Sequence, residues 1–155
     1  MIKILFVCHG NICRSPMAEF VFKDLVEKRG IADQFEIASA ATSTEEIWNG
    51  IGNPIYPPAI EELAEHGISC VGKRAVKLRS EDYKYYDYLI GMDSMNINNM
   101  MKIMKADSEG KIYMLLQFTG REGGIKDPWY TGNFKETYKD IFEGCSALLE
   151  YFESK

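Results

Sequence analysis

The sequence predicts an α/β fold: a single-domain, doubly wound sheet of four parallel strands with helices on both faces. Short apolar runs alternate with segments whose apolar residues recur every three or four positions, which is typical of strands followed by helices. The first run, residues 2–7, is almost continuously apolar, as expected of a central strand buried on both faces. With 155 residues, 46% of them hydrophobic, the chain is long enough for one core, and we expect residues 1–155 to form one domain.

A helix is expected directly after this strand. Ser15 and Pro16 are typical of a helix start, with a hydroxyl at the cap and a proline in the first turn. One apolar stripe follows at helical spacing and consists of Ala18, Val21, Phe22, Leu25 and Val26. Residues 28–30, Lys-Arg-Gly, end this helix with basic residues in the last turn and a glycine after it.

The same alternation continues along the chain. Further strands are expected at residues 35–40, 86–92 and 111–116. Further helices are expected at residues 59–66, from 80–82 onward, 94–105 and 134–152. Residues 49–58 and 120–133 are expected as loops, and long loops in compact domains often carry function. Ligands of a doubly wound sheet bind beyond the carboxyl ends of its strands, where the loop after the first strand lies.

Charge and composition exclude several classes of protein. The net charge of −5 and the pI of about 5.1 argue against nucleic acid or an anionic membrane as a partner. No stretch approaches the ~20 apolar residues of a transmembrane helix, and residues 2–7 are too short for a signal peptide. The cysteines lack C-x-x-C metal spacing and are too few for a disulfide scaffold: Cys8, Cys13, Cys70 and Cys145. We therefore expect free thiols, no metal and a cytoplasmic location.

The strongest functional signal is the segment 8–16, which reads Cys-His-Gly-Asn-Ile-Cys-Arg-Ser-Pro. A loop between a strand and a helix can turn its N–H groups inward, and with the helix dipole it forms an anion site. Arg14 can close that site with a bidentate fork, while the same positive field stabilises a Cys8 thiolate. The loop residues that would surround a phosphate are His9, Gly10, Asn11, Ile12, Cys13 and Ser15. This geometry favours phosphoryl transfer to sulfur.

Alternatives exist for these residues. A cysteine and an arginine six positions apart occur often by chance, so Cys8 could be a small buried residue and Arg14 a solvated charge. The position between a buried strand and a helix favours the phosphate loop. Ser15 has two compatible roles, as the helix cap and as a hydrogen-bond donor that stabilises the Cys8 thiolate when it leaves.

A general acid is expected in the second loop, because a leaving phenolate or alkoxide is expelled faster when an acid protonates it. Asp127 is followed by Pro128, which stiffens the chain, and by Trp129 and Tyr130, which can exclude water. The alternative is an ordinary Asp-Pro turn without a catalytic role.

Together these segments resemble the low-molecular-weight protein-tyrosine phosphatases. Residues 7–19 resemble the amino-terminal signature of that family, and residues 127–130 resemble its acid loop. The resemblance covers essentially the whole chain. It implies that Cys8 becomes phosphorylated, that Arg14 binds the phosphoryl oxygens, and that Asp127 protonates the leaving group and then activates water. It further implies phosphotyrosine proteins as substrates, inorganic phosphate as product and inhibitor, and no cofactor.

The resemblance extends to residues that support the loop. Asn11 resembles an asparagine that holds the loop in a left-handed conformation, which asparagine tolerates well. Ser39 and His66 resemble a serine and a histidine that support the loop through hydrogen bonds; the alternative for His66 is a cation at a helix C-terminus. The position of Cys13 implies a reversible disulfide with Cys8 on oxidation, which would make the protein redox-sensitive.

The pocket walls are also expected from the resemblance. Trp48, Trp129 and Tyr130 resemble the aromatic sides of a slot deep enough for a phenyl phosphate, with core packing as the alternative for either tryptophan. Ile12 stands where relatives that hydrolyse phosphoarginine carry threonine, which favours phosphotyrosine.

Three features of the rim depart from the family pattern. Residues 44–47 lengthen the stretch before the first tryptophan, and Tyr-Pro-Pro at 56–58 replaces the usual Asp-Pro-Arg. His9 adds a polar group where relatives often have leucine or threonine.

Two other functions fit part of the pattern. A thiol-dependent arsenate reductase on this scaffold would use Cys8 and Arg14 on arsenate, but it resembles a chain with two more redox cysteines near residues 80–90, where this chain has none. A non-catalytic phosphocarrier phosphorylated on cysteine would need no acid loop, whereas Asp127 is present. The phosphatase is the function that the sequence favours.

Overall fold

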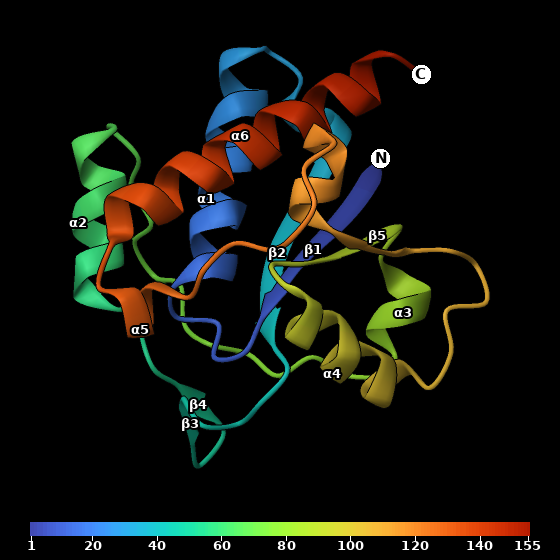
Figure 1. The fold of residues 1–155 in the computed structure, drawn as a ribbon, viewed down its shortest axis with the longest axis horizontal. Helices are drawn as coiled ribbons and strands as arrows, with labels where there is room; N and C mark the ends of the chain where they lie inside the picture. Colours follow the sequence, from blue (N-terminus) through green and yellow to red (C-terminus); the bar gives the residue numbers. More distant parts are fainter.

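A four-stranded parallel sheet forms the centre of the molecule, as the computed structural model of all 155 residues shows (Figure 1). Its strands are β1 (Ile2–Cys8), β2 (Phe35–Ala41), β5 (Tyr88–Gly91) and β6 (Ile112–Met114), in the order β2-β1-β5-β6. All three pairings are parallel. The predicted fold class is confirmed.

Helices cover both faces of this sheet. The helices of one face are α1 (Arg14–Lys28), α2 (Pro57–Glu65) and α6 (Phe134–Glu153), and those of the other are α3 (Asp82–Tyr85) and α4 (Ser94–Met104) (Figure 1). Successive side chains of β1 point alternately into the two cores on either side of the sheet. Ile4, Phe6 and Cys8 belong to the core under α1 and α6, while Leu5 and Val7 belong to the core under α4. This double burial explains the nearly continuous apolar run of β1.

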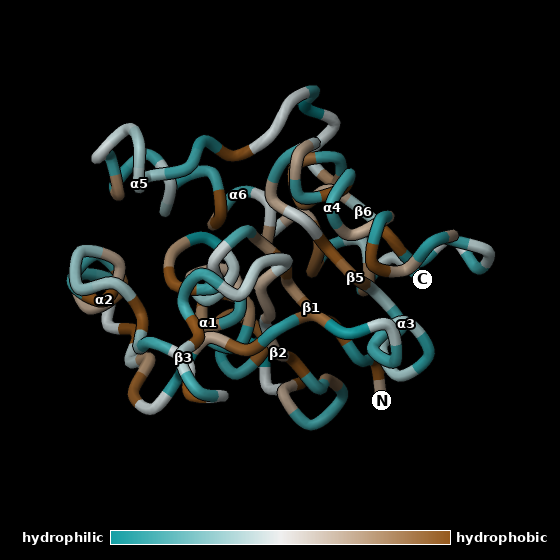
Figure 2. The backbone as a smooth tube through the Cα atoms, turned by 90° about the horizontal axis from the view of Figure 1, so that it is seen from below, coloured by the Kyte–Doolittle hydropathy of each residue, from teal (hydrophilic) through white to brown (hydrophobic).

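The hydropathy of the chain follows this layering. In Figure 2 the tube is brown along β5 in the middle of the molecule and mostly teal or white around α2 and α5 at its edge. Of the apolar stripe predicted for α1, Ala18, Val21, Phe22 and Val26 are buried. The helix ends at Lys28, and Gly30 is in a left-handed conformation, φ 75°. No helix has the length and apolar character needed to span a bilayer.

Some predicted boundaries were wrong. The expected strand 86–92 is four residues long, and the expected strand 111–116 ends at Met114, where the 3₁₀ helix η2 (Leu115–Thr119) begins. Leu115 and Leu116 are fully buried, and Gly144 of α6 lies so close to Leu115 that an added Cβ would meet its side chain at 2.6 Å. The residues expected at the end of the strand therefore pack against α6 as part of η2. A second 3₁₀ helix, η1 (Ala32–Gln34), precedes β2.

The two predicted loops contain short elements of their own. The first overlaps a hairpin formed by β3 (Ile47–Trp48) and β4 (Ile51–Gly52), and the second contains α5 (Pro128–Thr131). Both elements lie at the carboxyl-terminal edge of the sheet, beside the end of β1 (Figure 1). They flank the place where a doubly wound sheet binds its ligands.

Candidate active site

Cys8 is the last residue of β1, and the following loop brings hydrogen-bond donors to its sulfur. The backbone N–H groups of Asn11 and Ser15 donate to Cys8 Sγ at 3.3 and 3.4 Å, and Ser15 Oγ lies 3.0 Å from it. The expected capping role of Ser15 was wrong. α1 already begins at Arg14, so Ser15 lies within its first turn, and Cys13 at the N-cap makes no side-chain bond. The Ser15 hydroxyl faces the sulfur instead.

The loop is held in shape by Asn11. Its φ of 60° lies in the left-handed region, as expected, and its side chain is 1% exposed. Asn11 Nδ2 donates to Ser15 Oγ at 2.8 Å and to Ser39 Oγ at 2.9 Å, while its Oδ1 accepts from the N–H of Val76 at 3.1 Å. All three bonds of this buried amide are satisfied, so they offset the cost of the unusual backbone.

Ser39 links this network to a buried ion pair. The Ser39 hydroxyl donates to Glu19 Oε1 at 2.6 Å, and Lys73 Nζ donates to the Ser39 carbonyl at 2.9 Å and lies 3.7 Å from Glu19. Burial lowers the pKa of Lys73, while the charges of Glu19 and Cys8 act in the opposite direction. Sequence reasoning named Ser39 but missed both Glu19, which lies inside the motif, and Lys73, which no motif or spacing indicates.

His66 does not belong to this network, and its predicted support of the loop was wrong. It caps the C-terminus of α2, its Nε2 lies 3.0 Å from Glu62 Oε2, and its ring stacks on Tyr138 with 3.6 Å between centroids. The alternative reading as a histidine at a helix C-terminus fits this position. Lys73 takes the place that was expected of His66.

Arg14 is 3% exposed, and acceptors fix its guanidinium. Nη1 donates to Asp93 Oδ2 at 2.6 Å and to the carbonyl of Ile125 at 2.8 Å. Burial disfavours the charge, but the neighbouring Cys8 and Asp93 outweigh it and raise the pKa of Arg14. Arg14 is therefore a permanent cation beside the sulfur. Asp93, which the sequence did not identify, follows β5 and also caps α4 by accepting from the N–H of Asn96.

Asp127 is the N-cap of α5, and this position orients its carboxylate. Oδ1 accepts from the N–H of Trp129 at 3.0 Å, and Oδ2 lies 3.5 Å from Arg14 Nη2. The side chain is about one quarter exposed, so Oδ2 can reach a ligand in the cavity. Gly124 lets this loop pass close to Asp93, because an added Cβ would lie 2.6 Å from the Asp93 Cβ.

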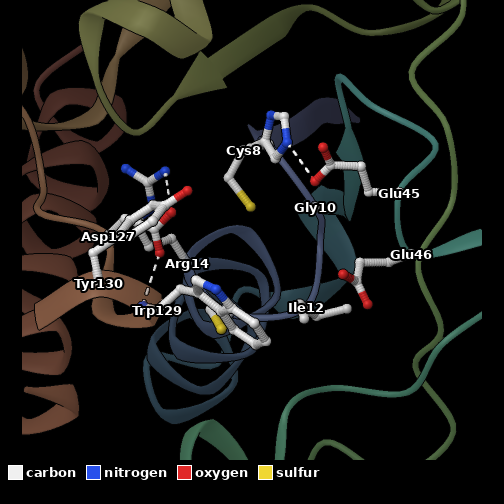
Figure 3. A pocket seen from close by; sticks show the side chains of 11 residues that line it. Cys8, Gly10, Ile12, Arg14, Glu45, Glu46, Asp127, Trp129 and Tyr130 are labelled. Carbon is white, nitrogen blue, oxygen red and sulfur yellow. Dashed lines mark hydrogen bonds and ion pairs between the residues drawn. The ribbon is translucent and has the colours of Figure 1, made fainter. Parts of the chain in front are cut away.

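These groups surround one cavity of about 130 Å³. Figure 3 shows Asp127, Trp129 and Tyr130 on one side of Cys8 and Glu45 and Glu46 on the other. The cavity is lined by Cys8, His9, Gly10, Ile12, Cys13, Arg14, Glu45, Glu46, Asp127, Trp129 and Tyr130. The structure thus brings together the predicted nucleophile, arginine and acid with two of the three predicted wall residues.

The third predicted wall residue, Trp48, was misplaced. It is 73% exposed on β3 and does not line the cavity, so it is neither a wall nor part of the core. Glu45 and Glu46 stand on that side instead. They belong to residues 44–47, which were expected to alter the rim but were not named as walls. Trp129 is 53% exposed and packs on Tyr56, with 4.9 Å between ring centroids. The unusual Tyr56 therefore supports a wall of the cavity.

All four cysteines are free thiols. Burial, followed by the charge of Cys8, raises the pKa of Cys13 to about 12. Cys13 is consequently a neutral thiol in a cavity where other groups carry charge. A disulfide between Cys8 and Cys13 stays a prediction. No three His, Cys, Asp or Glu side chains are grouped as metal ligands.

The arrangement is suited to a phosphate ester. Inward N–H groups and a buried guanidinium can bind the phosphoryl oxygens, the sulfur lies beneath them, and the carboxyl group of Asp127 lies beside the guanidinium.

Known proteins with similar sequences and structures agree with this interpretation of the site. Residues 3–155 match the family model described as low molecular weight phosphotyrosine protein phosphatase. The chain is 39% identical over 151 residues to the low molecular weight protein-tyrosine-phosphatase YfkJ of Bacillus subtilis, covering 96% of this chain and 94% of YfkJ. The crystal structure of YfkJ matches with a TM-score of 0.93 over 99% of this chain and 96% of that chain, at 37% identity.

Two further solved structures are similar. A low molecular weight protein tyrosine phosphatase of Streptococcus pyogenes is 41% identical with a TM-score of 0.85, covering 99% of this chain and 98% of that one. A Drosophila arginine phosphatase is 28% identical with a TM-score of 0.86, covering 97% of this chain and 98% of that one.

Proposed function

The chain belongs to the low molecular weight phosphotyrosine protein phosphatases, and from this premise we propose a residue for each step of phosphotyrosine hydrolysis. It is a cysteine-dependent protein-tyrosine phosphatase, and phosphotyrosine proteins and small aryl phosphates are its substrates. The domain extends over residues 1–155. One observation carries the assignment of roles: Cys8 Sγ, Arg14 and Asp127 line the same cavity, with Asp127 Oδ2 only 3.5 Å from Arg14 Nη2.

The phosphate group binds first at the base of the cavity. The N–H groups of the loop from His9 to Arg14 and the guanidinium of Arg14 hold its oxygens. Arg14 Nη1 is already engaged by Asp93 and Ile125, so these contacts fix the guanidinium plane and leave Nη2 for the phosphate. A guanidinium fixed in advance stabilises the charge of the transition state without reorganising.

In the first displacement Cys8 attacks phosphorus in line with the tyrosyl oxygen. The S–P bond forms, the P–O bond to the tyrosine breaks, and Asp127 delivers a proton to the leaving phenolate. The cap that Asp127 Oδ1 makes with Trp129 directs Oδ2 toward the cavity. The products of this step are a free tyrosine side chain and phosphocysteine.

In the second displacement water attacks the phosphocysteine. Asp127, now a carboxylate, accepts the proton from water, the S–P bond breaks, and the thiolate of Cys8 returns to its donors. Ser15 Oγ and the N–H of Asn11 stabilise that thiolate as a leaving group. Inorganic phosphate is released and, because it fits the same loop, it also inhibits. Neither step needs a metal or cofactor.

The walls favour an aryl phosphate. Trp129 and Tyr130 stand beside the acid, and Ile12 lines the cavity with an aliphatic side chain. A phenyl ring packs against such groups, whereas the short arm of phosphoserine would not bring its phosphate to Cys8.

The alternatives have less support. Residues 80–90 form α3 and the beginning of β5 without a cysteine, Cys145 is fully buried in the core, and Cys70 lies away from the cavity, so no second thiol pair is available for arsenate reduction. A phosphocarrier would have no use for the oriented Asp127. A cytoplasmic location stays a prediction from the free thiols.

The experiment that tests this function compares three peptides of the same sequence that carry phosphotyrosine, phosphoserine or phosphoarginine. Phosphate release by the wild-type chain is measured for each. We expect kcat/KM to be highest for phosphotyrosine. A preference for phosphoarginine would make the chain resemble the Drosophila relative in substrate, and release from none of the three would contradict the proposal.

A further inference from the structure

Two carboxylates on the wall opposite Asp127 are held in place without being neutralised by a permanent cation. Glu45 Oε2 accepts a hydrogen bond from His9 Nε2 at 2.8 Å, and Glu46 Oε1 accepts from Asn53 Nδ2 at 2.9 Å. No lysine or arginine forms an ion pair with either of them. Figure 3 shows both side chains across the cavity from Asp127.

The chain that carries these glutamates is fixed by the hairpin that follows it. Residues 49–50, Asn-Gly, have φ of 50° and 77°, which a two-residue hairpin turn requires. At the base of the hairpin, Gly52 lies against the backbone of Ala75, where an added Cβ would come within 1.9 Å of the Ala75 oxygen. Asn53 then returns a backbone bond to the carbonyl of Glu46 at 2.8 Å. The acidic wall is therefore preformed.

The one permanent cation that lines the cavity, Arg14, forms no ion pair with Glu45 or Glu46. Of the 11 lining residues, only Arg14 and His9 are basic. Arg14 lies at the base, is paired with Asp93 and is reserved for the phosphate. The rim beside Glu45 and Glu46 thus keeps a negative charge while the base attracts an anion.

We propose that Glu45 and Glu46 select phosphotyrosine substrates that carry a basic side chain next to the phosphotyrosine. The inference rests on the proposed function, since it requires phosphotyrosine to bind with its phosphate at Cys8. The neighbouring residues of the substrate then pass over the rim, where lysine or arginine forms charge-assisted hydrogen bonds with the two carboxylates. An acidic neighbour is repelled by them. The substrate class is a basic phosphotyrosine peptide.

The test uses three phosphotyrosine peptides that differ only in the residues flanking the phosphotyrosine: arginine, glutamine or glutamate. We expect kcat/KM to fall in that order, by roughly two- to fivefold for each step in charge, as for solvent-exposed ion pairs. The difference should shrink at high salt, because exposed charges are screened. In the double variant Glu45→Gln with Glu46→Gln, the arginine-to-glutamate ratio should move toward one.

A ratio of two substrates does not depend on how much of a variant is correctly folded, so partial misfolding does not blur the result. Glu109→Gln is the matched control, because Glu109 is an exposed glutamate in the loop before β6, at the opposite edge of the sheet. It should leave both the basal activity and the ratio unchanged.

Turnover of p-nitrophenyl phosphate distinguishes a failure of the proposed substrate selection from a failure of the proposed phosphatase activity. If the wild-type chain hydrolyses this small ester but has the same kcat/KM for all three peptides, the selection of basic substrates is overturned. The proposed phosphatase activity is not contradicted by that result. The selection is also overturned if the double variant keeps the wild-type ratio. Chain that hydrolyses neither ester nor peptide contradicts the proposed function and the inference with it.

Discussion

Ser15 Oγ lies 3.0 Å from Cys8 Sγ while it accepts a hydrogen bond from Asn11 Nδ2 at 2.8 Å. Since the bond from Asn11 occupies a lone pair of the hydroxyl oxygen, the hydroxyl proton is free to point at the sulfur. The serine thus acts as a donor to the thiolate. Asn11, in its left-handed conformation, determines the direction of that donation.

Ser15→Ala should slow the second displacement, because the departing thiolate loses a donor. Hydrogen bonds to charged groups contribute about 1.5–3 kcal/mol, which corresponds to a loss of roughly ten- to a hundredfold in the rate of phosphocysteine hydrolysis. Rapid-mixing measurements with p-nitrophenyl phosphate should show a burst of p-nitrophenol followed by a slower steady state. Ser80→Ala, at an exposed serine, is the control. An unchanged steady-state rate in Ser15→Ala would mean that the contact has no part in the reaction.

Asp127→Ala should slow esters with poor leaving groups far more than activated ones. The loss should be largest for phenyl phosphate and small for p-nitrophenyl phosphate, whose phenolate leaves without a proton. Asp127→Asn is the matched variant, because an amide oxygen can still accept the N–H of Trp129 and keep the cap. Equal losses on both esters, or full activity of the asparagine variant, would make the role of Asp127 structural.

Cys13 should resist alkylation at neutral pH. Its pKa is raised to about 12 by burial and by the charge of Cys8, so the neutral thiol persists until the pH rises through that value. Mass spectrometry after iodoacetamide treatment at pH 7 should find Cys8 modified and Cys13 unmodified. In urea all four thiols should react at similar rates. Rapid labelling of Cys13 in the folded chain would show that the thiol is less buried and more acidic than the structure indicates.

Trp48→Ala should leave hydrolysis of small aryl phosphates almost unchanged, since the indole lies outside the cavity. Trp129→Ala should raise KM for the same esters, because Trp129 is a wall. Steady-state kinetics with p-nitrophenyl phosphate measure both. Comparable rises in KM for the two variants would show that Trp48 is a wall of the cavity, which would contradict its position outside it.

The sequence predicted features whose cause is local. The phosphate loop could be predicted because its strand, short polar segment and helix are contiguous from Ile2 to Lys28. Asp127 could be predicted because it belongs to a four-residue loop motif. Asp93 and Lys73 were missed because their roles depend on contacts with residues 79 and 34 positions away, Arg14 and Ser39. No periodicity carries that information.

Trp48 shows a different kind of error. The family resemblance suggested that Trp48 is a wall, but the Asn-Gly pair at residues 49–50 is a strong signal for a two-residue hairpin. Trp48 lies on the first strand of that hairpin, exposed and outside the cavity. The local turn preference determined the position of Trp48, and Glu45 and Glu46 occupy the wall.

The most direct test of the account is the site of covalent phosphorylation during turnover. Wild-type chain is mixed with p-nitrophenyl phosphate, quenched in acid within milliseconds, digested and sequenced by mass spectrometry. We predict phosphate on Cys8, and in Cys8→Ser we predict loss of turnover with retained binding of vanadate. Phosphate on any other residue, or appreciable turnover by Cys8→Ser, would contradict the mechanism.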